Sequence, residues 1–264
     1  MLVLLARVAA AEESTFEGAK KPEAEATKAE AHAAAELGGI LVFGNTETMA
    51  LTGQGTVSYK LRRNQLSGTF GVNWGQSKID ADADGKLSAS ERETDYVQTA
   101  GREYGTLRYD RFLTQKDSLY VLGGGFTDTF AGYDYRVNGQ VGWSHAFVDI
   151  KKSALKAEIG MDVAQEDFVD GVDPAQQTVV SARAQVGWRY NFNDHVSFED
   201  TVEAYESVLD FTDVRINNTA AVSATLTNRL ALKLSHQLAF DNVPVEGYQP
   251  LDHTTLATVV FTVL

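Results

Sequence analysis

The chain has no cysteine and only four prolines among its 264 residues. Without cysteine it can form neither a disulfide nor a thiolate metal site, and a cysteine nucleophile is excluded. Proline in a central strand would remove a donor from the hydrogen-bond ladder. All four prolines lie outside the segments that read as strands: Pro22, Pro174, Pro244 and Pro250. The positions of the prolines therefore favour a continuous sheet.

Basic charge and long apolar runs are also scarce. The formal net charge is −13, which argues against a nucleic-acid partner because phosphate binding needs clustered Lys and Arg. An acidic balance fits a solvated surface and loops that attract cations. No stretch reaches the roughly 18 apolar residues of a membrane-spanning helix.

What the sequence does contain is long alternation of apolar and polar residues. Between residues 178 and 190, Val180, Val186 and Trp188 fall on one side of a strand, while Arg183 and Gln185 fall on the other. Such segments run for roughly ten to fourteen residues, whereas a typical globular strand has about five or six and a tilted bilayer-crossing strand about 9–11. Length and alternation together indicate a transmembrane β-barrel.

About twelve such strands follow one another from residue 37 to residue 264. Short turns alternate with long connections at residues 78–93, 167–177 and 241–252, as in bacterial outer-membrane barrels. We therefore predict an all-β fold, an antiparallel up-and-down transmembrane β-barrel of one domain, with both termini on the short-turn side. A soluble two-sheet sandwich is the alternative, but it would use shorter strands.

The first 36 residues differ in composition. Residues 1–11 end in small residues before an acidic one and are interpreted as the remnant of a secretory signal peptide. Residues 12–36, rich in Ala, Glu and Lys, are predicted to form a periplasmic tail that is helical or disordered. Export and a barrel place the protein in the bacterial outer membrane. There, membrane lipid surrounds it, and the barrel-assembly machinery is expected to be its partner in biogenesis.

The alternation assigns each residue to a face. The predicted lipid face includes Val57, Trp74, Tyr133, Val141, Trp143 and Leu234. Charged residues collect on the other face, and buried charges need partners. We predict a row of paired charges across the lumen formed by Asp162, Arg183 and Glu203. Glu103 and Asp200 conflict with this assignment, because both would face lipid unless a β-bulge shifts the register.

Residues 80–91 contain the sharpest local motif. They place oxygen-bearing residues at the spacing of an EF-hand calcium loop, with Gly85 at the sharp turn. The predicted ligands of one Ca²⁺ ion are Asp80, Asp82, Asp84, the Lys86 carbonyl, a water near Ser88, and Glu91. The flanking segments read as strands, so we expect a variant without helices. A merely acidic, solvated loop is the alternative interpretation.

Several short motifs resemble the family of salt-induced outer membrane proteins, a group defined by a domain of unknown function. The matching segments are Gly44–Glu47 (GNTE), Leu107–Leu113 (LRYDRFL), Gly132–Arg136 (GYDYR) and Leu232–Ser235 (LKLS). The resemblance covers roughly residues 36–264. It implies an outer-membrane location and no known reaction.

Three functions remain open from the sequence. The first is a structural or narrow-pore barrel with a calcium-binding external loop. The second is a surface binding or adhesion module whose calcium-ordered loops bind a polysaccharide, lipopolysaccharide or envelope protein. The third, remote, is a lipase-like enzyme, since Ser144 neighbours His145 and Ser235 neighbours His236. Adjacent strand residues point to opposite faces, so neither pair can form a nucleophile–base hydrogen bond within its strand, and no enzymatic activity is expected.

Overall fold

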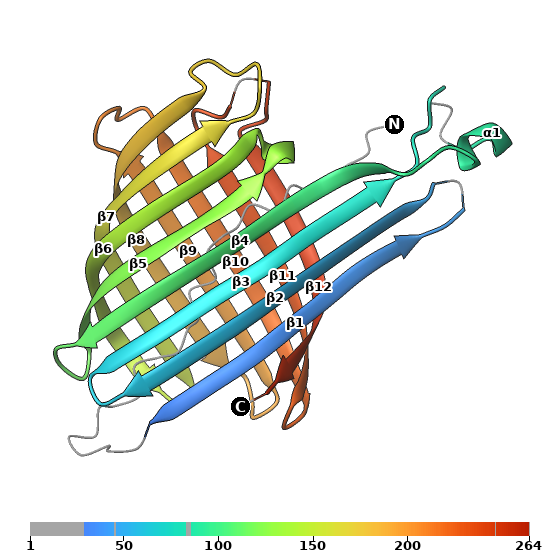
Figure 1. The fold of residues 1–264 in the computed structure, drawn as a ribbon. Coiled ribbons are helices and arrows are strands. Elements are labelled where there is room, and N and C mark those ends of the chain that lie inside the picture. Colours follow the sequence, from blue (N-terminus) through green and yellow to red (C-terminus); the bar gives the residue numbers. More distant parts are fainter. Residues whose placement is uncertain (1–28, 45, 83–85, 246, 264) are drawn as a thin grey trace.

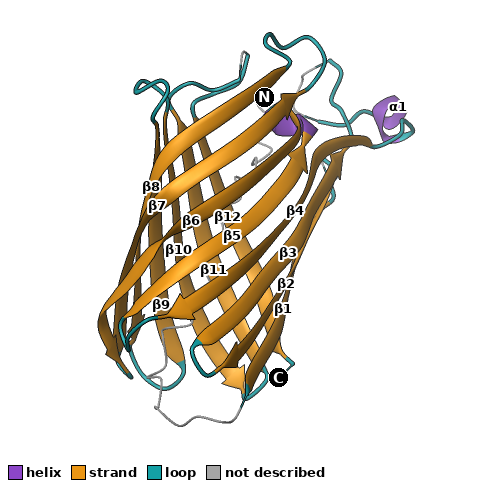
Figure 2. Cartoon of the chain, turned by 60° about the vertical axis from the view of Figure 1, so that its left-hand side comes forward, coloured by secondary structure: helices purple, strands orange, loops and turns teal. Residues whose placement is uncertain are grey.

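The chain folds into a closed barrel of antiparallel strands, seen in a computed structural model that describes residues 29–44, 46–82, 86–245 and 247–263 (Figures 1 and 2). Each strand pairs with its neighbours in the sequence, and the first pairs with the last. The predicted fold is thus confirmed. The strands are β1 (Glu30–Val42), β2 (Thr48–Leu61), β3 (Asn64–Ser77), β4 (Val97–Phe112), β5 (Asp117–Asp128), β6 (Tyr133–Ile150), β7 (Ser153–Phe168), β8 (Gln176–Asn191), β9 (Val196–Ser207), β10 (Val214–Thr227), β11 (Leu230–Asp241) and β12 (Leu251–Thr262).

The connections differ between the two ends of the barrel. At one end, turns of two to four residues join β2 to β3, β4 to β5, β6 to β7, β8 to β9 and β10 to β11. At the other end lie the longer loops, together with the short helices α1 (Ala89–Arg92) and η1 (Thr129–Ala131). Outer-membrane barrels carry their short turns on the periplasmic side, so the longer loops are external. No helix in the described ranges is long and apolar enough to cross a bilayer.

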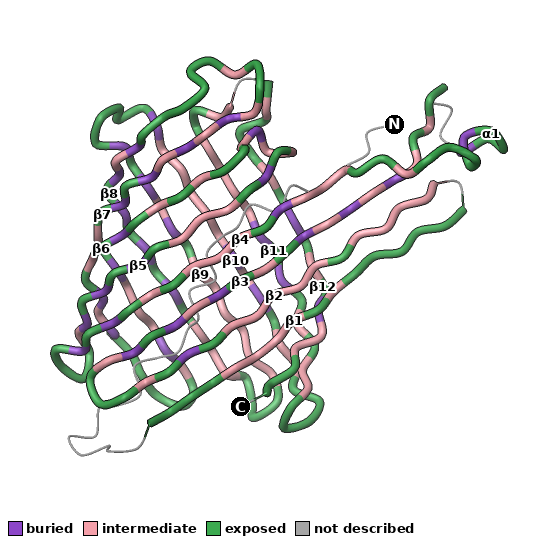
Figure 3. Tube along the Cα trace, in the orientation of Figure 1, coloured by how far each residue is buried: buried purple, intermediate pink, exposed green. Residues whose placement is uncertain are grey.

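The outer wall of the barrel is apolar and the inner wall polar, as the alternation predicts. Val57, Val141 and Leu234 are 48%, 54% and 56% exposed on the outer face, whereas polar residues of the same strands are buried inside (Figure 3). Tyr133 is an exception. A register shift between Tyr133 and Tyr135 in the β6–β7 pairing turns its ring inward, where it packs against Phe126 and Phe168. The alternation could not reveal this irregularity.

The first strand begins earlier than predicted. β1 starts at Glu30, so residues 30–36 of the predicted tail belong to the sheet. Each residue of β1 from Glu30 to Val42 has a register partner on β2. This continuous pairing satisfies the backbone and outweighs the helical propensity of an Ala- and Glu-rich segment. The predicted signal remnant 1–11, and residues 12–28 of the predicted tail, lie outside the described residues.

Glu103 and Asp200 both remain on the outer face. Glu103 is exposed and opposes Val72, an outward-facing residue of β3. It also marks the point where β4 ceases to pair with β5 toward the external end. Asp200 accepts a hydrogen bond of 2.7 Å from the side chain of Asn218, another outward residue. No bulge turns either carboxylate inward, so β4 and β9 carry polar positions on their outer surface.

Candidate functional site

An arginine–carboxylate network crosses the lumen, and Arg183 of β8 is at its centre. Its guanidinium forms an ion pair with Glu203, donates to Glu158 at 3.0 Å and donates to the Tyr120 hydroxyl at 2.6 Å. Its third nitrogen donates to Gln185 at 2.7 Å. The Arg183 side chain is 2% exposed. The charge is therefore removed from water and held by hydrogen bonds on every side, as a buried ion requires.

Arg108 of β4 extends this network across the barrel. It binds both oxygens of Asp110 at 2.8 Å and both oxygens of Glu158, at 2.8 and 3.0 Å. Glu158 lies on β7, three strands away around the wall, so these side chains reach across the lumen. We call Arg108, Asp110, Tyr120, Glu158, Arg183 and Glu203 the central charge network. It narrows the lumen at this level.

Two glycines make room for Tyr120 in the network. A β-carbon at Gly142 would lie 2.5 Å from the Tyr120 hydroxyl, and one at Gly160 would lie 2.8 Å from it. These positions on β6 and β7 therefore let the ring lie close against the wall. From there the hydroxyl reaches Arg183, and the ring lies 4.1 Å from the Arg108 guanidinium, a cation–π distance.

The predicted charge row is present only in part. The structure brings Arg183 and Glu203 together, although their strands pair two residues out of the predicted register: Arg183 opposes Tyr205. Asp162 is fully buried but opposes Ser181 rather than Arg183. The expected contact of Asp162 with Arg183 is therefore wrong, and Glu158 occupies that place. A register error of two residues keeps each side chain on its predicted face but moves it along the barrel.

Asp162 belongs instead to a second cluster closer to the external mouth. It accepts from Asn138 at 2.8 Å and lies 3.8 Å from Arg136. Arg136 also pairs with Glu166 at 3.1 Å, and Glu166 is shared with Arg215. Arg215 in turn contacts Asp213 at 3.1 Å and Asp241 at 3.3 Å. Two arginines hold four carboxylates here, so the charges are paired but the cluster is net negative.

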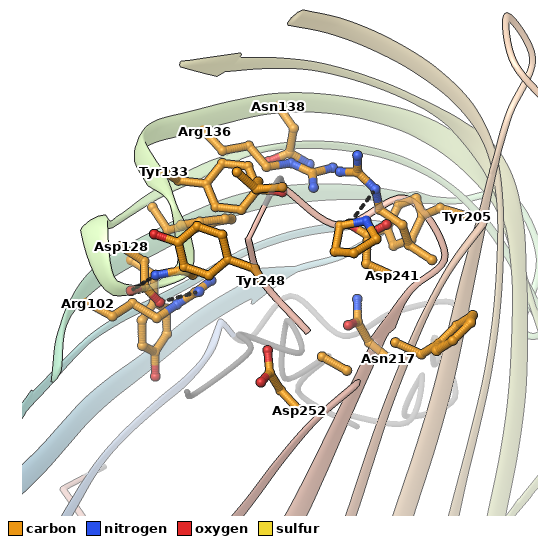
Figure 4. A pocket seen from close by; sticks show the side chains of 18 of the residues that line it. Arg102, Asp128, Tyr133, Arg136, Asn138, Tyr205, Asn217, Asp241, Tyr248 and Asp252 are labelled. Atoms are coloured by element: carbon orange, nitrogen blue, oxygen red, sulfur yellow. Dashed lines mark hydrogen bonds and ion pairs between the residues drawn. The ribbon is translucent and has the colours of Figure 1, made fainter. Parts of the chain in front are cut away.

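Between these clusters and the loop that joins β11 to β12 lies a cavity of about 170 Å³ (Figure 4). We call it the vestibule. A buried water needs about 10–15 Å³ of such cavity space, so the cavity has room for several water molecules or one small polar solute. Its lining combines aromatic, amide and charged groups; those labelled in Figure 4 are Arg102, Asp128, Tyr133, Arg136, Asn138, Tyr205, Asn217, Asp241, Tyr248 and Asp252.

Gly132 lets the loop between β11 and β12, which we call the covering loop, pack closely over the vestibule. It adopts φ +88°, and a β-carbon there would lie 2.9 Å from Tyr248 and 3.0 Å from Val245. Both residues belong to the β11–β12 loop, which therefore packs against the turn between η1 and β6. Gly132 opens the GYDYR motif, so that motif has a structural role in covering the mouth.

The predicted calcium loop is partly visible. Asp80, Asp82 and Glu91 each offer a carboxylate oxygen, and these oxygens lie within 4.8 Å of one another. Asp84, with Gly85, lies outside the described residues. Lys86 and Ser88 are exposed, and the Ser88 hydroxyl donates to Glu91 at 2.7 Å. Three predicted carboxylate ligands thus converge.

The expectation of a helix-free loop is wrong. Ser88 caps the four-residue helix α1 through a reciprocal capping box with Glu91, a Ser-x-x-Glu pattern that the sequence contains. Hydrogen bonds from the Ser88 hydroxyl, the Ser88 amide and the Ala81 amide lower the pKa of Glu91 to about 2. Glu91 is therefore ionised at neutral pH.

Glu47, in the connection between β1 and β2, binds residues of this loop. We call these contacts, which we did not predict, the Glu47 clamp. Arg92 pairs with Glu47 at 3.0 Å and donates to the Gly44 carbonyl at 2.5 Å. Tyr96 donates to the other Glu47 oxygen at 2.9 Å, and this hydrogen bond raises the pKa of Tyr96. Glu47 ends the GNTE motif, whose Asn45 lies outside the described residues. The motif was the available signal, but its partners lie about 45 residues away in the chain.

The two Ser–His neighbours are separated by the strand pleat. Ser144 and Ser235 are buried on the luminal face. His236 faces outward and contacts Thr255 at 3.0 Å, and His145 contacts Asp117 at 2.8 Å. Neither serine therefore meets the histidine beside it.

The closed barrel, its apolar outer wall and its charged lumen define a channel-like β-barrel of the bacterial outer membrane. Residues 35–263 match DUF481, described as a protein of unknown function. The chain belongs to this family.

A solved porin structure supports the same fold, and a channel structure is less similar. The NanC porin is 11% identical with a TM-score of 0.54, over 88% of this chain and 100% of the porin. An outer membrane channel from Pseudomonas putida F1 is 14% identical with a TM-score of 0.45, over 89% of this chain and 94% of the channel. No curated protein matches. At these identities the likeness concerns the fold alone.

Proposed function

We propose that the protein is a narrow outer-membrane channel for small polar solutes. The observation that carries this proposal is that the central charge network, although it crosses the lumen, is built from only part of the strand ring. Its members come from β4, β5, β7, β8 and β9. Besides the Glu36–Lys233 ion pair at 3.2 Å, the remaining wall presents short hydroxyl side chains, including those of Ser58, Thr219, Ser235, Thr254 and Thr258. Short side chains leave room for a passage beside the network.

The passage would filter by size and by hydrogen bonding. Twelve strands give a barrel between the eight-stranded type, which side chains fill, and the sixteen-stranded open porins. Proteoliposome swelling tests this size limit directly. We expect glycerol and a monosaccharide to enter and a trisaccharide to be excluded. Equal entry of all three, or of none, would contradict a narrow channel.

The covering loop gives a matched pair of variants. Gly132→Ala should displace Tyr248 and Val245, widen the mouth and increase the single-channel conductance. Gly171→Ala is the control, because Gly171 has a similar φ of +96° but nothing within 4 Å of its β-carbon position. If both variants changed conductance equally, backbone strain and not displacement of the loop would be the cause.

We further propose that the external loop binds one Ca²⁺ ion through Asp80, Asp82, Asp84, Glu91 and the Lys86 carbonyl, with a water near Ser88. The convergence of three carboxylate oxygens supports this. Oε1 of Glu91 accepts from the Ala81 amide and Oε2 from both the amide and the hydroxyl of Ser88, so calcium binding through Oε2 would replace one of the Ser88 hydrogen bonds. Calcium would then order the loop beside the Glu47 clamp. A calcium-ordered surface that binds a polysaccharide, lipopolysaccharide or protein partner remains the second candidate function.

Titration calorimetry on the folded barrel should show calcium binding with Kd of about 10⁻⁴–10⁻³ M, the range of weak extracellular sites. Asp80→Asn should remove the heat, whereas Glu93→Gln, an exposed carboxylate outside the cluster, should leave it unchanged. Magnesium should compete poorly, since it prefers a tighter octahedral shell. Identical heats for wild type and Asp80→Asn would mean that the loop is only acidic.

A further inference from the structure

Only the segment Ala34–Gly38 of β1 is paired with β12 at the seam between these two strands. Register partners run from Ala34 and Thr262 to Gly38 and Thr258, where the pairing stops. β1 continues to Val42 beside β2 alone, and β12 continues to Leu251 beside β11. In the described part of the chain no strand adjoins Gly39–Val42 on this side. Figure 1 shows the two strands separating toward the end that carries the long loops.

The open part of the seam, beside Gly39–Val42, lies at a level where the outer wall is still apolar. Gly39 opposes Leu51, which opposes Trp74. Leu41 and Leu51 are 65% and 61% exposed on this outer surface. Such a surface belongs in hydrocarbon, where each unpaired backbone group costs several kcal/mol. Whatever occupies the open seam must therefore offset that cost.

Beside the open part of the seam, the luminal face of β1 becomes apolar. Ile40 and Val42 point to the luminal side by alternation, yet they are 54% and 39% exposed. Leu256 of β12 is on the same face, opposite the buried Ser235. Elsewhere the inner wall is mainly polar, although it includes buried apolar residues such as Leu122 and Phe168. Apolar side chains on the β1 edge, and Leu256 beside the polar Asp252 and Thr254 on the β12 edge, thus line a path from the lumen to the lipid.

The vestibule faces this path. The residues that line it come from β3 to β6, from β9 to β12 and from the covering loop, and none comes from β1 or β2. In the closed ring β1 and β2 stand between β3 and β12. β7 and β8 contribute no lining residue either, so two sides of the vestibule lack lining residues, and one of them is the side of the open seam.

We propose that the β1–β12 seam is a lateral route between the vestibule and the outer leaflet, taken by amphiphiles with an uncharged polar head and one apolar chain. The head would hydrogen-bond to the amides of Asn138 and Asn217 and to Tyr248. An uncharged head fits because Arg102 pairs with Asp128 at 3.3 Å and Arg215 with Asp241 at 3.3 Å. This deepens the proposed channel function and rests on it.

Lipid access to the seam is tested by fluorescence. The chain has no cysteine, so one introduced cysteine carries one bimane label. In vesicles with brominated lipid chains, bimane at Ile40→Cys should be quenched as strongly as at Leu234→Cys on the lipid face. Bimane at Thr56→Cys, a luminal position on β2 paired on both sides, should be quenched several-fold less. Quenching at Ile40→Cys no stronger than at Thr56→Cys would overturn the proposal.

Passage is tested with an octyl glucoside brominated on its chain, and bimane at Ala239→Cys, a vestibule position with no role in head-group binding, reports its arrival. Ile40→Arg should lower this quenching several-fold, because it places a charge on the apolar path. Thr56→Arg should leave it unchanged. No quenching in the parent, or equal quenching in all three proteins, would overturn the lateral route. Potassium chloride conductance of the same proteins reports the channel separately, so the failure of either proposal can be recognised by itself.

Discussion

Arg183→Ala is expected to lower the free energy of unfolding by about 3–5 kcal/mol, the range for removing one partner of a buried ion pair. The loss arises because Glu203, which is 4% exposed at its side chain, keeps a charge with its main partner gone. The charge of Glu158 is better compensated, since Arg108 and Lys156 still form ion pairs with it. Urea titration of the barrel folded into lipid vesicles measures the change.

The double variant Arg183→Met/Glu203→Gln serves as the matched control for this expectation. It removes both charges of the pair while keeping similar volumes, so most of the lost stability should return. The single variant should also shift the channel toward cations, because the lumen gains net negative charge. A double variant as unstable as Arg183→Ala would show that packing and not charge pairing dominates at this position.

Val57→Arg is expected to cost about 2–4 kcal/mol on folding into a bilayer, the range for a basic residue on the lipid face near the midplane. Its neighbour Thr56→Arg should be tolerated, since Thr56 faces the lumen and opposes only Ala34 and Thr69. The two substitutions introduce the same side chain one residue apart. Refolding into vesicles, followed by gel mobility, separates them, and the opposite ranking would invert the assignment of faces.

The alternation of residues was sufficient to predict the fold and most of the faces. A strand has a period of two, so Val57, Val141 and Arg183 are assigned correctly even when strand ends are uncertain by a few residues. Reasoning from alternation failed where the backbone is irregular or the local composition favours a helix. The register shift beside Tyr133 reversed that ring, and the pairing of β1 with β2 drew Glu30–Glu36 out of a segment with helical composition.

The candidate site was less accessible to prediction because its contacts cross the barrel. Strand order places Arg183 near Glu203, because β8 and β9 are adjacent strands of the sheet. Nothing local brings Arg108 to Glu158, since their strands are not adjacent and only long side chains join them. Likewise, the GNTE motif marked Glu47 without revealing Arg92 or Tyr96. Side-chain reach and loop packing determine these contacts, and neither leaves a periodic signal.

Single-channel recording in planar bilayers tests the channel proposal most directly. Purified barrel in potassium chloride should give discrete current steps smaller than those of sixteen-stranded porins, and a reversal potential that moves toward cation selectivity in Arg183→Ala. Folded barrel that inserts into the bilayer but yields no steps, in the wild type and in Gly132→Ala alike, would contradict a conducting lumen.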